Sequence, residues 1–363
     1  MSNIPADTDY GAYLQLEKIL GAQAPARPEA HDETLFIIVH QAYELWFKEI
    51  LHELDSIQRL FDSDALQERA LGTVESRLER ISAIERLLVE QVRVLETMTP
   101  LDFLDFRDVL SSPRGFQSVQ FREIELRLGV RRAAPGLLES CSFFRALKPA
   151  DRDHLKSLEG QDSLFTGVES WLARMPFLHY GDYDFWRDYL KATAAMLNDD
   201  LSALEGDGGL SPAEQRAHVR ELSETIARFD GLFDSVRYAQ LRADNKVRFS
   251  QEAMLAALFI QLYRDEPVLQ QPFRVLNRLV AVDEGLCTWR YQNTLMIKRL
   301  LGRCNNGLSG AASTRLGPEP PRVFEDLFSL ASFLLPRSRL PTLPDALRRD
   351  LDFHFSGRGD WGG

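Results

Sequence analysis

Two side chains in the first third of the sequence have the chemistry to bind and transform a small anionic molecule. The first is His40, which follows Phe36 by one helical turn and precedes Tyr43 and Phe47 at helical spacing. An imidazole beside aromatic rings suits general acid–base chemistry near neutral pH. The alternative is a structural histidine with satisfied hydrogen bonds. His40 is therefore a candidate catalytic residue, with a packing role as the competing interpretation.

The second is Arg107, which follows the apolar and acidic segment "PLDFLDF". A guanidinium binds a carboxylate through two parallel hydrogen bonds, so Arg107 could fix the carboxylate of a ligand. An ion pair with Asp105, with Asp108 or with a remote carboxylate is the structural alternative.

A third position is notable for what it lacks. In "TWRYQNTLMIKRLLG", residues Trp289, Asn293, Met296 and Leu300 share one face of a predicted helix, and Asn293 interrupts an otherwise apolar stripe. No histidine occurs between residues 219 and 353, so this region offers no imidazole to a metal. The simplest role for such an amide is a hydrogen bond to a buried water or carbonyl.

Helical periodicity dominates the elements that must position these residues. Apolar residues recur every three or four positions in "DETLFIIVHQAYELWFKEILHELDSIQRLF", for which Asp32 is the expected N-cap, and in residues 74–98, where Pro100 is expected to end the helix. Similar patterns cover residues 115–128, 183–204, 213–235, 250–264, 270–302 and 322–335. Residues 130–163 and 303–322 read as loops. The sequence predicts an all-α fold.

The composition excludes several classes of partner. A formal net charge of −11 and a pI near 5.3 disfavour nucleic acid and anionic membrane surfaces. Three scattered cysteines, Cys141, Cys287 and Cys304, fit a reducing compartment rather than a disulfide framework. The first residues lack the pattern of a secretory signal, and no apolar run is long enough to span a membrane. We expect a cytoplasmic protein.

Several longer segments resemble one known family. They are "DYGAYLQLEKILGAQ", "HDETLFIIVHQAYELWFKEILHELDSI", "PLDFLDFRDVL", "GFQSVQFREIELRLG", "LYRDEP", "WRYQNTLMIKRLLG" and "DLFSLASFLLPR". Over nearly its whole length the chain resembles the tryptophan 2,3-dioxygenases. The resemblance implies an all-α homotetramer that binds haem and oxidatively opens the indole ring of L-tryptophan.

The resemblance also implies roles for individual residues. His40 matches the histidine that faces the indole nitrogen of the substrate, Phe36 matches an aromatic residue lining that pocket, and Arg107 matches the arginine that pairs with the substrate carboxylate. The resemblance further implies that residues 1–30 form an arm that covers a neighbouring subunit's site. No linker divides the rest of the chain, so we expect residues 31–363 to form a single helical domain with a flexible loop at 303–322. The matching arm residues are Tyr10, Tyr13 and Leu14.

The sequence departs from the family at three places. Asn293 occupies the position of the histidine that ligates the haem iron, and an amide is a poor iron ligand. The loop at 303–322 contains "NNGLSGAAS" where the family has a Gly-Thr-Gly-Gly-Ser-Ser-Gly motif whose threonine helps to hold the substrate. Arg114 falls where relatives have a small serine near the haem, and it could fill space or meet an anion.

From these departures we expect an enzyme of specialised biosynthesis that binds an aromatic amino acid or indole derivative but does not perform histidine-ligated haem dioxygenation. In this interpretation no cofactor is needed, His40 acts as acid or base, and Arg107 fixes a carboxylate. One alternative is a haem-dependent indole or aromatic amino acid oxygenase with a non-histidine axial ligand, for which Cys304, Cys287 or Tyr291 are the candidates. Another is a non-catalytic oligomer, a dimer or tetramer, that binds a ligand.

Overall fold

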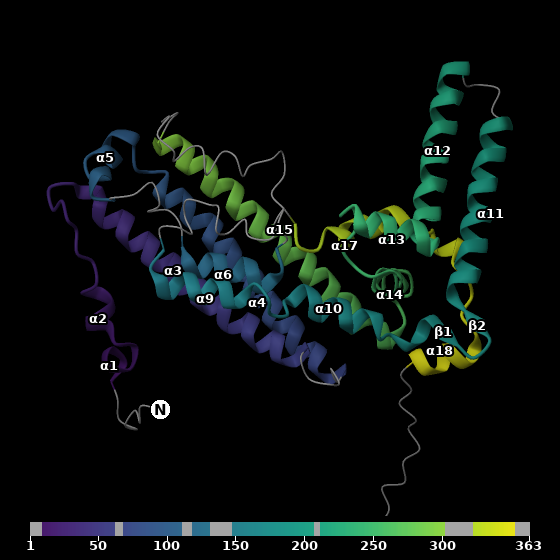
Figure 1. Cartoon of the computed structure of the whole chain (residues 1–363), viewed down its shortest axis with the longest axis horizontal. Coiled ribbons are helices and arrows are strands. Elements are labelled where there is room, and N and C mark those ends of the chain that lie inside the picture. The colour runs from purple at the N-terminus through teal and green to yellow at the C-terminus, as the bar shows by residue number, and fades with distance from the viewer. Residues whose placement is uncertain are drawn as a thin grey trace, which may run out of the picture. The chain divides into compact units, whose positions relative to one another are not determined.

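The computed structural model describes residues 9–61, 68–110, 118–130, 147–206, 211–301 and 322–352. This part of the chain is almost entirely helical, and the all-α prediction is confirmed. Its only strands are β1 (His179–Tyr180) and β2 (Tyr183–Asp184), which form one antiparallel pair. The helices, which Figure 1 labels where there is room, are α1 (Tyr10–Leu14), α2 (Leu16–Leu20), α3 (His31–Phe61), α4 (Glu68–Leu95), α5 (Pro100–Leu104), α6 (Val119–Leu128), α9 (Pro149–Leu158), α10 (Leu164–Ala173), α11 (Phe185–Gly206), α12 (Pro212–Phe233), α13 (Ser235–Ala243), α14 (Gln251–Leu262), α15 (Pro267–Leu301), α17 (Glu325–Ser329) and α18 (Asp345–Leu351). Short 3-10 helices are η1 (Arg107–Val109), η2 (Pro176–Leu178), η3 (Leu330–Phe333) and η4 (Arg337–Arg339).

The chain divides into two compact units. The first comprises residues 1–55, 80–161 and 284–322, and the second comprises residues 56–79, 162–283 and 323–363. The three long helices α3, α4 and α15 each contribute a part to both units. The expected arm at residues 1–30 falls within the first unit, and its function in a neighbouring subunit stays a prediction.

Helix α3 forms because its apolar residues recur at helical spacing and are buried along one face. Phe36, Val39, Phe47 and Ile50 are all at most 6% exposed. The expected N-cap was wrong by two residues, because the helix begins at His31 and Asp32 lies in its first turn. A carboxylate in the first turn still interacts favourably with the helix dipole.

The second predicted helix, expected at residues 74–98, ends earlier than expected. Helix α4 ends at Leu95, and Pro100 instead begins the next helix, α5. The Thr99 side chain accepts a hydrogen bond from the backbone of Asp102, and the Asp102 side chain accepts one from the backbone of Thr99. This capping box starts α5, and proline suits the first helical position because no amide hydrogen is needed there.

In the first unit the contributions of α3, α4 and α15 pack closely together. The Tyr43 hydroxyl on α3 donates to the Leu88 carbonyl on α4 at 3.3 Å. Helix α15 approaches α4 at Gly285, where an added Cβ would lie 2.3 Å from Oε2 of the buried Glu85. Any larger residue would require the Glu85 carboxylate to move.

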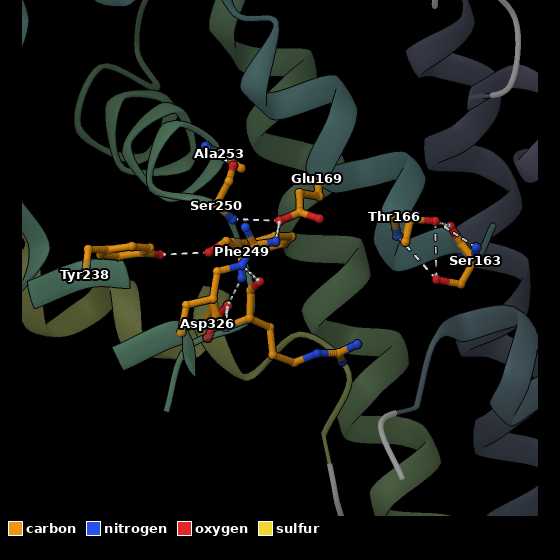
Figure 2. A network of polar contacts seen from close by, with 10 residues as sticks. Ser163, Thr166, Glu169, Tyr238, Phe249, Ser250, Ala253 and Asp326 are labelled. Atoms are coloured by element: carbon orange, nitrogen blue, oxygen red, sulfur yellow. Dashed lines mark hydrogen bonds and ion pairs between the residues drawn. The ribbon is translucent and has the colours of Figure 1, made fainter. Parts of the chain in front are cut away.

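The second unit is organised around α14, whose residues 253–260 are buried on every side. Two carboxylates, the buried Asp326 and the partly buried Glu169, fix the chain segments around this helix, and Figure 2 shows part of their network. Asp326 accepts the backbone N–H groups of Arg248 and Phe249 at 2.7 and 2.6 Å, and Glu169 accepts that of Ser250 at 2.7 Å. These charge-assisted bonds satisfy the amides of the segment that enters α14.

The same kind of contact fixes the start of the segment 322–352. Asp283, on α15 and 2% exposed, accepts hydrogen bonds from the backbone N–H groups of Val323 and Phe324, each at 2.9 Å.

The described helices include none that is long and apolar enough to cross a membrane.

Candidate functional site

The candidate site begins with a row of rings along α3. The centroids of Phe36 and His40 are 4.0 Å apart, and the ring of Tyr43 lies 6.1 Å from that of His40 in an edge-on arrangement. Phe47 continues the row, stacked at 6.2 Å on Tyr43. The spacing i, i+4, i+7, i+11 places all four rings on one face of the helix.

Two phenylalanines near the end of α5 connect this row to Arg107. The rings of Phe103 and Phe106 lie 6.1 and 5.5 Å from that of Phe36, and 5.3 Å from each other. Arg107 directly follows Phe106 and begins η1. The structure therefore brings Phe36, His40 and the segment carrying Arg107 together, although more than sixty residues separate them in sequence.

The environment of His40 selects one protonation state. Its Nδ1 lies 2.8 Å from the Phe36 carbonyl, which can only accept, so Nδ1 must carry the hydrogen and Nε2 is the basic nitrogen. Burial lowers the pKa of His40 below its ordinary 6.5, against smaller opposing effects of the Phe36 carbonyl and the negative charge of Glu44. At neutral pH His40 is an uncharged imidazole able to accept a proton at Nε2.

Helix α15 completes the other end of the row. The Trp289 ring lies 5.9 Å from Tyr43, 5.5 Å from Phe47 and 4.6 Å from Phe121 of α6. The stripe that the sequence predicted on α15 is present, because Met296 and Leu300 are buried as well as Trp289. One turn after Trp289, Asn293 is partly buried between them.

The aromatic residues of the expected arm lie apart from this cluster. On α1, Tyr10 and Tyr13 are 75% and 62% exposed, and Leu14 is exposed as well. The base of the arm is tied to α3: the Gln23 side-chain amide donates to Oε1 of Gln41 at 2.7 Å, one residue after His40.

A groove of about 530 Å³ on the first unit is not the predicted site. Its α3 residues are spaced so that they lie on roughly the opposite side of the helix from His40. It is lined by Ala42, Leu45, Trp46, Glu49, Arg80 and Ile84.

Three predicted features lie outside the described residues. They are Arg114, the loop at 303–322 apart from its last residue, and Cys304 as a candidate iron ligand. Their predicted roles stay predictions.

The structure adds residues that the sequence analysis did not single out. Phe103 and Phe106 contact Phe36 across some seventy residues, and Gln120 of α6 donates to Glu44 of α3. The available signal was the position of Glu44, one turn after His40. Its partner on α6 could not be identified from spacing.

Comparison with known proteins gives the geometry a family. A family model described as "Tryptophan 2,3-dioxygenase" matches residues 3–334. A protein of that name from Alteromonas mediterranea is 43% identical over 352 residues, covering 95% of this chain and 97% of its own. The chain belongs to the tryptophan 2,3-dioxygenase family. Proteins of the same name from Bdellovibrio bacteriovorus and Dictyostelium discoideum are 43% and 38% identical, covering 95% and 96% of this chain and 98% and 88% of their own.

Membership corrects one expectation. We expected no cofactor, with a haem that is not ligated by histidine as the other possibility. That expectation of no cofactor is wrong, because the tryptophan 2,3-dioxygenases are a haem-dependent enzyme family and the similarity extends along nearly the whole chain.

The described residues nevertheless do not fit a haem iron held by the protein at position 293. The only polar group that Asn293 offers is a neutral amide, which donates weakly to iron. Cys287 is buried and Tyr291 is 51% exposed, and helical geometry turns both more than a quarter of the way around α15 from Asn293.

Proposed function

We propose that this member of the tryptophan 2,3-dioxygenase family is an enzyme acting on an aromatic amino acid of the tryptophan type, at a site built on His40 and Arg107. The observation that carries the proposal is the joining of His40, Phe36 and Phe106 in one ring cluster, with Arg107 next in the chain. Tryptophan, the amino acid after which the relatives are named, is the first candidate in its L form.

In this proposal Phe36 and its neighbouring rings provide apolar aromatic contacts for an indole. Offset and edge-on contacts between aromatic rings contribute about 0.5–1.5 kcal/mol each beyond their area. Nε2 of His40 faces the indole N–H, accepts its proton when the ring reacts, and returns that proton to the product. The lowered pKa described above favours the uncharged form of His40 before substrate binds.

Arg107 is the proposed clamp for the carboxylate of the amino acid. A bidentate guanidinium–carboxylate pair fixes both position and orientation, so the indole would be presented to His40 in one pose. Arg114 is a second cation that we propose near the substrate.

We further propose that the protein is a homo-oligomer, a dimer or tetramer, in which Tyr10, Tyr13 and Leu14 cover the site of a neighbouring subunit. Their exposure supports this, because an arm with large exposed apolar side chains loses that unfavourable hydration on docking.

The finer proposal concerns position 293. We propose that the family's iron-ligating histidine is replaced here by Asn293, so that the chemistry departs from histidine-ligated dioxygenation. A haem-dependent aromatic amino acid oxygenase with a non-histidine iron ligand is the form of this proposal that agrees with the family.

Hemin titration of the full-length protein tests the assignment of residue 293. Turnover of L-tryptophan is then measured by oxygen uptake and by loss of indole absorbance. We expect weak or spectrally non-histidine hemin binding in the wild type and tighter binding with a histidine-type spectrum in Asn293→His. A wild-type spectrum already typical of histidine ligation would contradict the assignment of residue 293. Binding of L-tryptophan without turnover under any condition would instead indicate a non-catalytic ligand-binding protein.

A further inference from the structure

A polar pair beside the ring cluster has no role in the account above. Glu44 follows His40 by four residues on α3, so the two side chains lie on the same strip of the helix. Gln120 of α6 donates through Nε2 to the Glu44 carboxylate at 2.7 Å and to the Glu44 backbone carbonyl at 2.9 Å. One amide therefore holds both the side chain and the backbone of Glu44.

This double contact fixes where the negative charge lies. An exposed glutamate would sample many rotamers and its field would be screened by water. Glu44 is instead partly buried and held by a residue seventy-six positions away in sequence. Glu44 lies one helical turn after His40, and its negative charge raises the pKa of His40. His40 is itself oriented by the Phe36 carbonyl one turn earlier.

We propose that Glu44, held by Gln120, is a positioning residue for His40, stabilising the protonated imidazole and so setting the pH range in which Nε2 can accept a proton. The inference rests on the proposed acid–base function of His40. In the resting state burial keeps the ring neutral. When Nε2 takes the substrate proton, the imidazolium faces a carboxylate that is already in place and needs no rearrangement.

The other charges nearby do not replace Glu44. Among the described residues, its charge is the one that shifts the pKa of His40, and it does so upward, against the larger effect of burial. Glu125 is taken up by ion pairs with Arg122 and with Arg290, the latter at 2.7 Å. Tyr43 on α3 lies edge-on to His40 with ring centroids 6.1 Å apart, and Arg107 begins η1 directly after Phe106.

The test compares isosteric variants of the full-length protein by the pH dependence of deuterium exchange at Cε1 of His40, read by mass spectrometry. Glu44→Gln removes the charge but keeps a group that can accept from Gln120. Its exchange midpoint for His40 should move to lower pH, and Gln120→Ala should move it in the same direction by less. Glu44→Asp, which retains the charge, should recover part of the shift.

Glu49→Gln is the matched control, because it removes the same charge from α3 on the face opposite His40. It should leave the midpoint unchanged. An unchanged midpoint in Glu44→Gln, or an equal shift in Glu49→Gln, would overturn the inference. The exchange measurement needs no substrate, so a shifted midpoint without any turnover of an indole amino acid would reject the proposed function and retain this coupling. With turnover, the acid limb of kcat/KM should move with the midpoint.

Discussion

The imidazole of His40 lies against the ring of Phe36, with centroids 4.0 Å apart, while its Nδ1 donates to the carbonyl of the same residue at 2.8 Å. One residue thus fixes the plane of the imidazole and the position of its proton. The consequence is a histidine presented as a base through Nε2 before any ligand arrives.

Replacing His40 should separate binding from chemistry. His40→Ala removes the proposed base, and general acid–base catalysis contributes typically 10²–10⁴-fold, so we expect kcat to fall by about that range. The dissociation constant for the amino acid should change by only a few-fold, because Phe36 and Arg107 remain. The exposed His52 on the same helix gives the control variant His52→Ala, which should match the wild type.

The folded protein should lose stability in acid through His40. Its pKa is lowered by folding, so below 6.5 the unfolded chain binds this proton more readily than the folded chain does. The His40 contribution to the free energy of unfolding is fully present above 6.5 and declines as the pH falls below it, down to the folded pKa.

Urea unfolding between pH 5 and 8 would measure this contribution. His40→Gln, which cannot be protonated there, should show a shallower decline below pH 6.5 than the wild type. A parallel decline in both proteins would mean that His40 is not the group responsible.

The close approach of α15 to α4 gives a prediction about stability alone. Gly285→Ala should lower the free energy of unfolding by about 1–3 kcal/mol, because its methyl group would overlap the Glu85 carboxylate. Gly72 lies within α4, and a Cβ added there would meet no atom within 4 Å. Gly72→Ala should therefore raise the free energy of unfolding by about 0.5–1 kcal/mol. Chemical denaturation of both variants checks the opposite signs, and an unchanged Gly285→Ala would show that the helices can separate there.

The arm gives a prediction about assembly. Tyr10→Ser together with Tyr13→Ser should weaken binding of the amino acid at a partner's site while leaving the helical content unchanged, because both side chains are exposed within one protomer. Mixing this variant with His40→Ala should restore activity in hetero-oligomers, which contain a native arm over a native His40. If mixing restores no activity, the arm does not act at the site of a neighbouring subunit, and this prediction is contradicted.

The sequence predicted the elements that carry the site better than it predicted the site's connections. The period of α3 and α15 was visible because one face of each is apolar and buried over many turns, and Phe36 and His40 follow from that period. Short helices such as α9, α10 and α13 were missed because each presents too few turns for a periodic signal. Contacts such as Gln120 with Glu44 depend on how helices pack, which no local pattern records.

The helix ends show the same limit. Asp32 and Pro100 have the residue types of a cap and a stop, yet each lies inside the first turn of a helix. The residue type indicates that a helix end is near. The surrounding packing decides whether a helix starts or stops there, and at which residue.

The central claim is that Arg107 and the ring cluster around His40 bind an aromatic amino acid, and calorimetry with L-tryptophan and tryptamine tests it most directly. Tryptamine has the same indole and amine but no carboxylate. Charged hydrogen bonds contribute about 1.5–3 kcal/mol, so wild-type protein should bind L-tryptophan roughly ten- to a hundredfold more tightly than tryptamine. Arg107→Gln should remove that preference and leave tryptamine unaffected, whereas the exposed Arg93→Gln should change neither. An unchanged preference in Arg107→Gln, or no binding of either ligand to the wild type, would contradict the account.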